Sequence, residues 1–387
     1  MTVQVLIGDV FDQLGSIPAK SVDCVVTSPP YWGLRDYGVE GQIGLEPTIG
    51  EHLDVMVRVF REVRRVLKPQ GTLWLNYGDC YASAPNGRAA ADVENDDRTF
   101  RDKPFSTVGG VLKPKDLCML PNRLAIALQE DGWWVRSEII WHKPNPMPES
   151  VYDRPTVAHE KVWLLTKGED YFYNHEAIRE PVTGGAHRRA KARGTDTGVG
   201  WGHQDEVAGN PRGRGRIKVP GGWDTKPGSH GTINRSGRTS AEYRSQPGVT
   251  PKSAPENSNI KAKGSFHAST TELVETRNSR NVWTIAPKAF RQAHFATFPP
   301  ALAERCILAG TPETVCGCCG APNGCGPICE VFGREPGKVL DPFGGAGTVS
   351  LVAEQHGRDS IMIELNPDYA EIARARLGLV PAREEAA

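Results

Sequence analysis

The sequence of 387 residues lacks the features that mark several classes of protein. It has no run of about 18 apolar residues, which excludes a membrane-spanning helix. Its first residues show no basic segment with a cleavage site, so we expect no secretory signal and a cytoplasmic protein. It has no excess of either charge, with 46 Lys and Arg against 46 Asp and Glu. The composition therefore predicts a soluble globular protein of one large domain or two ordinary ones.

The balance of charge is uneven along the chain. Residues 184–265 hold 15 Lys and Arg against 6 Asp and Glu, a net charge of +9, and the remainder carries −9. This stretch is rich in Gly, Pro and Ser and poor in large apolar residues, so it cannot offset its ordering entropy by burial and is expected to be partly disordered. Concentrated positive charge of this kind is suited to a polyanionic partner.

Outside this stretch, strand and helix patterns alternate. We predict strands over 3–7, 21–26, 72–76, 134–141, 161–166, 338–340 and 360–363, and periodic structure resumes at 281–283 after the basic stretch. Helices are expected over 51–67, 121–130, 300–309, 347–355 and 367–377, and a loop over 82–115. Alternation on both sides of the basic stretch predicts one doubly wound α/β domain that an insert divides in sequence.

A glycine-rich turn follows the strand at 338–340 and opens a helix. It reads Asp341-Pro-Phe-Gly-Gly-Ala-Gly-Thr348, and the next strand ends at Glu364. Glycines let the backbone approach a ligand, and an acid about 20 residues further on is placed to bind ribose hydroxyls. The turn matches neither the dinucleotide pattern nor a P-loop, because Asp-Pro-Phe precedes the glycines and no Gly-Lys-Ser/Thr follows. It indicates a nucleoside cofactor.

A second loop, Thr27-Ser-Pro-Pro-Tyr-Trp32, follows the strand at 21–26. Its two prolines fix φ and remove two backbone donors, which makes the loop stiff and rich in acceptors. It lies at the carboxyl edge of the sheet, where ligands of α/β proteins bind. Tyr31 is suited to stacking on a planar substrate, although a rigid turn with a buried tyrosine would show the same letters.

Together the two loops resemble those of the amino-methylating DNA methyltransferases, which use S-adenosylmethionine. The order here, with the Ser-Pro-Pro-Tyr loop first, an insert next and the cofactor loop last, resembles their circularly permuted β group. The resemblance extends to residues 67–76, 141–146, 159–160 and 294–300. It implies a Rossmann-like methyltransferase sheet formed by 1–183 and 281–387, with a basic, Gly-rich target-recognition insert over 184–280.

The resemblance also assigns roles to residues. Tyr31 would stack on a base flipped out of the helix, while the Ser28 hydroxyl and the Pro29 carbonyl would accept hydrogen bonds from its exocyclic amine. With Pro30 these residues form the expected catalytic set. Positioning would supply most of the rate in a direct transfer without a covalent intermediate. The expected cofactor residues are Asp9, Phe298, Asp341, Phe343, Gly344, Gly345, Gly347, Thr348 and Glu364. Neither His142 nor His159 is expected to act as a base.

Ser28 bears on the choice of base. In the family, Ser-Pro-Pro-Tyr is more typical of cytosine-N4 enzymes and Asp-Pro-Pro-Tyr of adenine-N6 enzymes, with exceptions in both. Cytosine-N4 in double-stranded DNA is therefore favoured, and adenine-N6 stays open. Two functions of other kinds also fit this fold, namely methylation of protein glutamine and nucleic-acid binding by an inactive protein. The permuted order and the +9 insert argue against the former, and the intact loops against the latter.

The insert is expected to contact DNA. Its candidate phosphate contacts are Arg212, Arg214, Arg216 and Lys218, and its candidate stacking residues are Trp201, Trp223 and Tyr243. No endonuclease motif is visible, so a restriction enzyme that acts on the same site would be a separate protein.

Five of the nine cysteines lie within fourteen residues. Four of them, with turn-forming glycines between, could hold a structural zinc ion: Cys316, Cys319, Cys325 and Cys329. The link between the two pairs is short for a zinc ribbon, and a loop of free thiols is the alternative. Methyl transfer needs no metal, so the expected role is structural.

Overall fold

The computed structural model describes residues 1–34, 38–83, 106–181, 276–288, 299–322 and 332–379. Contacts divide the chain into two units, one of Met1–Arg179 with Asn278–Ala387 and one of Glu180–Arg277. In the second unit, β6 (Glu180–Pro181) pairs antiparallel with β7 (Thr276–Arg277). The predicted domain boundaries at 183/184 and 280/281 stay a prediction, because residues 182–275 lie outside the described residues.

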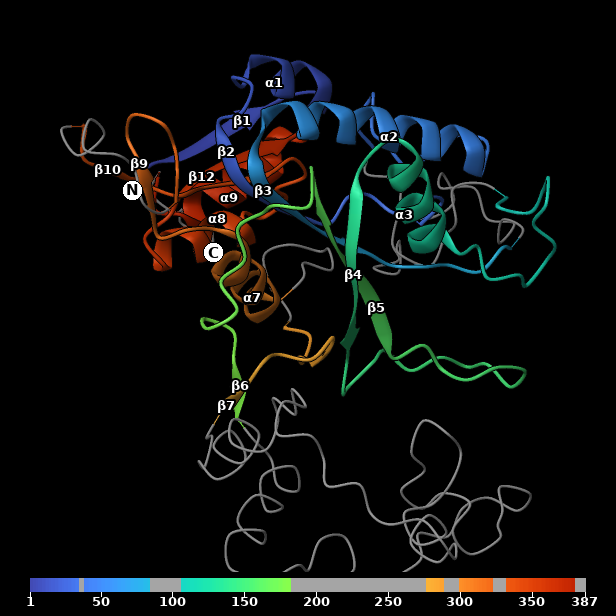
Figure 1. Ribbon diagram of the computed structural model, residues 1–387. Helices are drawn as coiled ribbons and strands as arrows, with labels where there is room; N and C mark the ends of the chain where they lie inside the picture. Colours follow the sequence, from blue (N-terminus) through green and yellow to red (C-terminus); the bar gives the residue numbers. More distant parts are fainter. Residues whose placement is uncertain (35–37, 84–105, 182–275, 289–298, 323–331, 380–387) are drawn as a thin grey trace, which may run out of the picture. The chain divides into compact units, whose positions relative to one another are not determined.

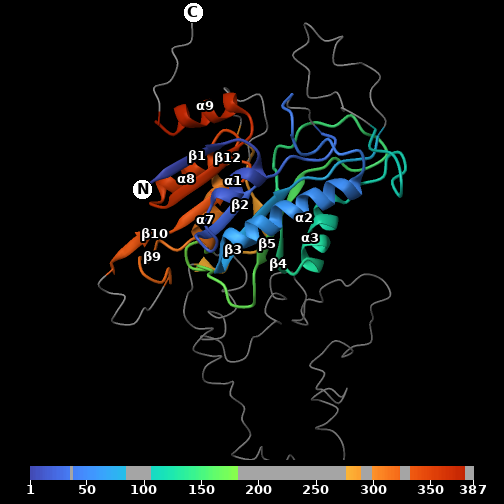
Figure 2. The ribbon, with the colours of Figure 1, turned by 90° about the horizontal axis from the view of Figure 1, so that it is seen from above.

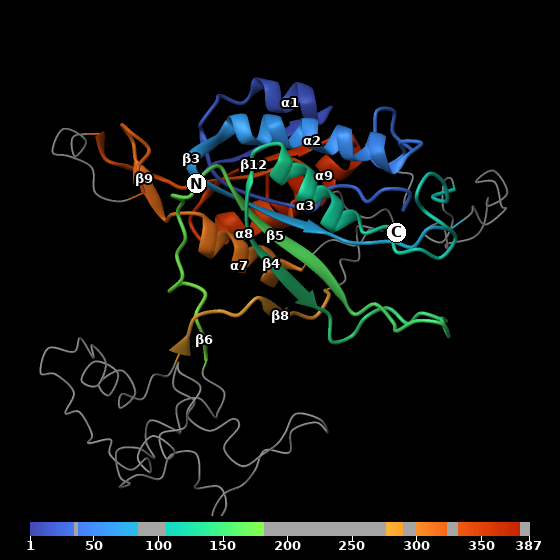
Figure 3. The same cartoon turned by 45° about the vertical axis from the view of Figure 1, so that its right-hand side comes forward.

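The first unit is built on an eight-stranded sheet with the order β1-β12-β11-β2-β3-β5-β4-β8 (Figure 1). The strands are β1 (Val3–Ile7), β2 (Val22–Thr27), β3 (Leu67–Tyr77), β4 (Trp134–His142), β5 (His159–Thr166), β8 (Val282–Thr284), β11 (Lys338–Asp341) and β12 (Asp359–Glu364). Strand β5 runs antiparallel to β3 and β4, and the other neighbours are parallel. Figure 3 shows β8 beside β4 at one end of the sheet. The predicted doubly wound α/β fold is confirmed.

Helices cover both faces of this sheet (Figure 2). Helices α1 (Val10–Ser16), α2 (Ile49–Val66) and α3 (Leu120–Glu130) pack their apolar residues into one core cluster. Helices α7 (Pro300–Gly310), α8 (Thr348–Gln355) and α9 (Pro367–Arg376) lie on the opposite face. No helix in the described part of the chain is long and apolar enough to cross a membrane.

Helix α2 shows why the local sequence specifies these elements. Thr48 and Glu51 form a capping box, in which each side chain accepts a hydrogen bond from the other residue's backbone N–H. The buried residues Met56, Val59, Phe60 and Val63 recur at helical spacing and form one apolar face.

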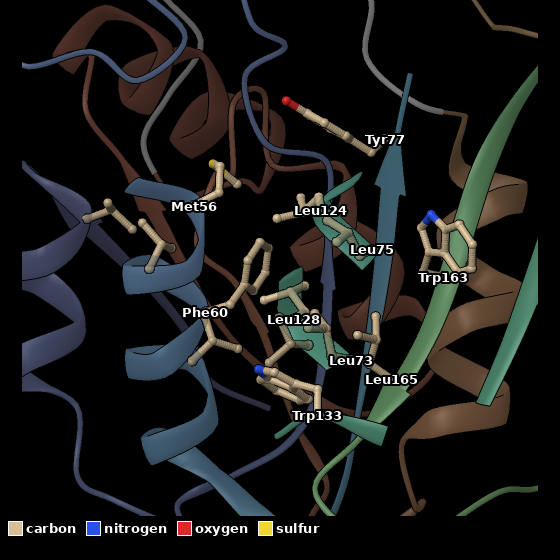
Figure 4. Packing of buried hydrophobic residues seen from close by; sticks show 14 of the residues in the cluster. Met56, Phe60, Leu73, Leu75, Tyr77, Leu124, Leu128, Trp133, Trp163 and Leu165 are labelled. Atoms are coloured by element: carbon tan, nitrogen blue, oxygen red, sulfur yellow. The ribbon is translucent and has the colours of Figure 1, made fainter. Parts of the chain in front are cut away.

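The core between α2, α3 and the sheet is closely packed. Figure 4 shows Phe60 of α2 and Leu128 of α3 meeting Leu73 of β3, with Trp133 below them. Each of these side chains is at most 2 % exposed. Burial of one such side chain contributes about 1.5–3 kcal/mol to the free energy of unfolding, so this core holds α2 and α3 firmly against the sheet.

Several elements differ from the sequence prediction. Helix α1 was not predicted, and strand β3 begins at Leu67 rather than residue 72. A small hairpin of β9 (Thr314–Cys316) and β10 (Arg334–Pro336) flanks the cysteine cluster. Part of the 82–115 loop is fixed: Thr107 is buried, and Gly109 and Leu112 exchange two backbone hydrogen bonds.

Candidate active site

The carboxyl ends of the parallel strands meet at one edge of the sheet. The cofactor loop follows β11, the Ser-Pro-Pro-Tyr loop follows β2, and β2 pairs directly with β11. The two candidate loops, far apart in sequence, are thereby brought side by side. Because β5 is antiparallel, its first residues lie at this edge with the last residues of β3 and β4.

Asp341, the last residue of β11, is 2 % exposed and held on two sides. Its Oδ1 accepts hydrogen bonds from the Thr27 hydroxyl at 2.7 Å and from the Phe343 N–H at 3.1 Å. Burial raises the pKa of Asp341 to about 7, the charge of Glu364 adds to the rise, and the two hydrogen bonds oppose it. A buried carboxylate of this kind is suited to a cationic partner, such as an amino group.

The glycines of the cofactor loop serve different purposes. A Cβ on Gly344 would lie 2.6 Å from Cε of Met362, so this position needs glycine to let the loop pass β12. Gly345 and Gly347 have φ of +50° and +72°, and a Cβ on Gly345 would meet nothing within 4 Å. The open side of Gly345 leaves room for a ligand to approach the backbone.

Thr348, one of the predicted cofactor residues, lies at the end of this loop. It is 4 % exposed and begins α8, and its Oγ1 accepts a 2.9 Å hydrogen bond from Nη1 of Arg376 on α9. The same Arg376 nitrogen donates to the Ala346 carbonyl at 3.0 Å. These contacts tie the loop to α9, and the contact of Thr348 with the cofactor stays a prediction.

Glu364 ends β12 beside this loop. Its two carboxylate oxygens accept hydrogen bonds from the backbone N–H groups of Gly345 and Asn366, each at 2.8 Å. Burial raises its pKa. These bonds orient the carboxylate, which keeps free lone pairs for hydroxyl donors such as those of a ribose.

Asp9 and Phe298 are the remaining predicted cofactor residues. Asp9 caps α1, and its Oδ1 accepts from the N–H of Phe11 at 2.8 Å. The neighbouring Gly8 N–H bonds the Glu364 carbonyl at 3.0 Å, so Asp9 stands next to the end of β12. Its contact with an adenine stays a prediction, and Phe298 lies outside the described residues.

The side chains of the Ser-Pro-Pro-Tyr loop enter a polar cluster. The Tyr31 hydroxyl donates to Oε2 of Glu160 at 2.8 Å and lies 3.4 Å from the Ser28 hydroxyl. Nδ2 of Asn76 lies 3.2 Å from Ser28 Oγ, 3.3 Å from the Tyr31 hydroxyl and 3.0 Å from Glu160 Oε2. Lys143 forms an ion pair with the other oxygen of Glu160.

The ring of Tyr31 is also confined. It packs edge-on against Tyr77, with 5.1 Å between the ring centroids. A Cβ on Gly78 would lie 2.4 Å from Cε2 of Tyr31, so only glycine fits there. Tyr77 is fixed in turn, because its hydroxyl lies 2.6 Å from Nε2 of the buried His52, whose Nδ1 lies 2.8 Å from Glu46.

The sequence prediction did not assign roles to Asn76, Lys143 or Glu160. Asn76 lies in β3, Lys143 directly follows β4, and Glu160 lies near the start of β5. Strand register brings them together, because it pairs Trp141 of β4 with Glu160 of β5. The available signal was their position next to predicted strand ends. His142 and His159, which were not expected to act as bases, lie nearby on the paired strands, and His142 Nδ1 lies 3.2 Å from the Thr284 hydroxyl.

The cysteine cluster is only partly described. The N–H of Cys318 lies 3.4 Å from the sulfur of Cys316, and Gly320, with φ of +71°, bonds back to the Cys316 carbonyl. Cys316 is buried and Cys319 exposed, while Cys325 and Cys329 lie outside the described residues. Within the described ranges no group of three possible metal ligands occurs, and the zinc prediction stays a prediction.

The fold is that of a Rossmann-like methyltransferase. A solved structure of similar fold is the PvuII DNA methyltransferase, described as cytosine-N4-specific, with a TM-score of 0.52 and 16 % identity over 100 % of this chain and 89 % of that one. A family model described as DNA methylase, of the N6 and N4 methyltransferases, matches residues 22–375.

Curated relatives match over most of their length. The type II methyltransferase M.XycI of Xanthomonas campestris pv. cyanopsidis and M.Cfr9I of Citrobacter freundii are each 38 % identical over 371 residues, 96 % of this chain and 86 % of theirs. M.SmaI of Serratia marcescens is 34 % identical over 374 residues, 97 % of this chain and 90 % of its own. The chain belongs to the N6/N4 DNA methylase family, whose methyl donor is S-adenosylmethionine.

Proposed function

We propose that this enzyme methylates the exocyclic N4 of cytosine in double-stranded DNA. The observation that carries the proposal is the position of Ser28, a neutral acceptor whose loop is bonded through Thr27 to Asp341 of the cofactor loop. The description of the PvuII enzyme as cytosine-N4-specific supports the same base. The observed residues suit the cofactor, because Asp341 is a buried carboxylate in need of a cation and the loop at Gly345 is open to a ligand.

The chain's residues would act chiefly by positioning. S-adenosylmethionine supplies a methyl group on a positively charged sulfur. Asp341 holds the amino group of the cofactor, and Glu364 accepts from its ribose hydroxyls. Tyr31 stacks on the flipped cytosine, and Ser28 Oγ and the Pro29 carbonyl accept from its N4 hydrogens. These bonds turn the nitrogen lone pair towards the methyl group, so that no covalent enzyme intermediate is needed.

Adenine-N6 methylation is the second candidate, since the same acceptors would receive an adenine amine. Nucleoside mass spectrometry of DNA from cells that express the protein, against an empty vector, separates the two. We expect N4-methylcytosine. N6-methyladenine would keep the mechanism and overturn the base. Neither mark, from protein that binds the cofactor, would contradict both.

We assign recognition of the DNA sequence to the insert of 184–280, because enzymes of the resembling family keep their recognition region at this place in the chain. Its +9 stretch can contact the DNA phosphates. We also propose that the protein acts in the cytoplasm of a bacterium, which the bacterial sources of its relatives support. The relatives are named type II methyltransferases, and this name supports a separate restriction endonuclease as the partner that we propose. Digestion of DNA from expressing cells with candidate endonucleases would reveal protection, and cleavage of every site would argue against the pairing.

We also propose a structural zinc ion on Cys316, Cys319, Cys325 and Cys329. The bond from the Cys318 N–H to the Cys316 sulfur supports it, because such a donor stabilises a thiolate. Elemental analysis of the purified protein should give about one zinc per chain, lost in a Cys316→Ser variant and kept in Cys80→Ser. Protein without zinc after purification in zinc-supplemented medium would contradict the proposal.

A further inference from the structure

The polar cluster around Tyr31 has a definite direction of hydrogen bonding. Glu160 accepts through Oε2 and is paired with Lys143 through its other oxygen. An ionised carboxylate can only accept, so Asn76 must turn its NH₂ group towards it and the Tyr31 hydroxyl must donate its single hydrogen to it. The direction of the remaining bonds follows from these two assignments.

Ser28 stands at the other end of this series. Its hydroxyl lies 3.4 Å from that of Tyr31, whose hydrogen is already given to Glu160. Ser28 is therefore the donor in this pair. It also accepts from Asn76 at 3.2 Å. With one hydrogen of Asn76 given to Glu160, the other is shared between Ser28 at 3.2 Å and the Tyr31 hydroxyl at 3.3 Å. A hydroxyl has one hydrogen and two lone pairs, so Ser28 has no hydrogen for a further partner and keeps at least one lone pair.

We propose that Glu160, held by Lys143, is a positioning residue that makes the Ser28 hydroxyl an obligate acceptor for the target amine. Hydrogen bonds are donated from Ser28 to Tyr31 and from Tyr31 to Glu160. The target amine therefore meets a lone pair of the Ser28 oxygen rather than its hydrogen. This inference rests on the proposed function. It adds Glu160, a residue outside the Ser-Pro-Pro-Tyr loop, which fixes the orientation of the Ser28 hydroxyl towards the base.

A serine in this loop creates the need for such a device. An aspartate is acceptor-only, whereas a free serine hydroxyl can rotate and present its hydrogen to the amine nitrogen. That alternative would occupy the nitrogen lone pair that must attack the methyl group. A serine hydroxyl whose hydrogen is bonded elsewhere can only accept from the amine, as an aspartate does, but it carries no charge.

Three further observations support the assignment. The side chains of Glu160 and Lys143 are only 18 % and 22 % exposed, so their ion pair is sheltered from solvent. The Lys143 ammonium also lies 4.5 Å from the centroid of the Trp141 ring, which fixes it from another side. Burial and the charge of Glu160 raise the pKa of Tyr31 well above its usual value, so its hydroxyl keeps the hydrogen that the series requires.

A double-mutant cycle tests the proposal on the full-length enzyme. Glu160→Gln keeps the shape but can turn an NH₂ group towards Tyr31, and Tyr31→Phe keeps the stacking ring but removes the link. We expect each variant to lower kcat by about 10- to 100-fold with little change in KM for DNA. Because both act through the same series, the double variant should be no slower than the slower single variant.

A matched control lies next to Glu160 on the same strand. Lys161 of β5 forms a similar ion pair with Glu138 of β4, 2.6 Å apart and outside the polar cluster. Glu138→Gln should leave kcat unchanged. Glu160→Asp, which retains an acceptor-only group, should recover part of the activity lost in Glu160→Gln.

Binding of S-adenosylmethionine by calorimetry completes the design. All variants should bind it as the wild type does, which shows that they are folded. Multiplicative losses in the double variant, or a loss that appears in KM alone, would overturn the positioning role of Glu160. A wild-type enzyme that leaves N4-methylcytosine absent would instead overturn the proposed function, so the two failures are distinguishable.

Discussion

Thr27 and Asp341, 314 positions apart in sequence, are joined by a 2.7 Å hydrogen bond from Thr27 Oγ1 to Asp341 Oδ1. Each is the last residue of its strand, and both are buried. The bond sets the spacing between the loop expected to hold the target base and the loop expected to hold the methyl donor. It also lowers the pKa of Asp341, against the effect of burial.

This bond predicts how cofactor binding depends on pH. Only ionised Asp341 attracts the amino group of S-adenosylmethionine, and the pKa of Asp341 is about 7 without it. Affinity should therefore rise as pH increases through about 6 to 7.5, by at most about tenfold per unit. Thr27→Val removes a bond that lowers this pKa, so the rise should move to higher pH. Calorimetry at several pH values would measure it, and identical profiles would contradict the role of Thr27.

Asp341→Asn should separate stability from function. A folded-state pKa above the unfolded value means that stability is lost as pH rises from about 4 towards 7, by at most about 4 kcal/mol. The asparagine variant avoids this loss. Its Tm should exceed that of the wild type by an amount that grows between about pH 4 and pH 7 and then levels off, while it no longer binds the cofactor. A constant difference in Tm would refute the assignment.

Gly78→Ala tests the confinement of Tyr31. The new Cβ would lie 2.4 Å from the Tyr31 ring, so the ring must move away from its position against Tyr77. We expect turnover to fall by at least about tenfold, because small displacements of a positioning group cost rate steeply. Gly15→Ala in α1, where a Cβ meets nothing within 4 Å, is the control and should keep full activity. Equal rates would show that Tyr31 needs no fixed position.

Tyr31→Ala removes the stacking ring altogether. Stacking of a base on an aromatic side chain contributes about 1–3 kcal/mol, and the variant also loses the link from Ser28 to Glu160. We expect methylation to be nearly abolished and cofactor binding to be preserved, since Asp341 and Glu364 are untouched. Single-turnover methylation with calorimetry of the cofactor would test this, and unchanged turnover would end the stacking role.

The pairing of β6 with β7 permits a clean deletion of the insert. Glu180 pairs with Arg277 and Pro181 with Thr276, so a two-residue Asn-Gly turn can replace residues 182–275. The shortened chain should bind S-adenosylmethionine and melt cooperatively, because the main sheet lies in the other unit. It should lose DNA binding in a gel-shift assay. Retained sequence-specific binding would place recognition outside the insert.

Most of the longer helices could be predicted from the local sequence. The helix expected over 51–67 is found at Ile49–Val66, and the one over 121–130 at Leu120–Glu130. Strong apolar periodicity and clear start and stop signals account for this agreement. Helix α1 was missed because seven residues are too few to show a period, although Asp9 was a visible cap.

The polar cluster could not be predicted in the same way. Asn76, Lys143 and Glu160 meet only because β5 runs antiparallel between β3 and β4, and no local pattern states the direction of a strand. The resemblance to known enzymes supplied the loop residues Ser28 and Tyr31, whereas the residues that orient them depend on strand register. Such contacts are a property of the assembled sheet.

The position of β1 has a consequence for synthesis of the protein. In the described sheet its neighbour is β12, with Val3 opposite Ser360. A ribosome adding about 5–20 residues per second needs roughly 20 to 70 s to pass from one strand to the other. Throughout that time the first strand of the nascent chain has no partner for its backbone, and its valines have not met α9. The sheet can therefore be completed only after β12 has been synthesised.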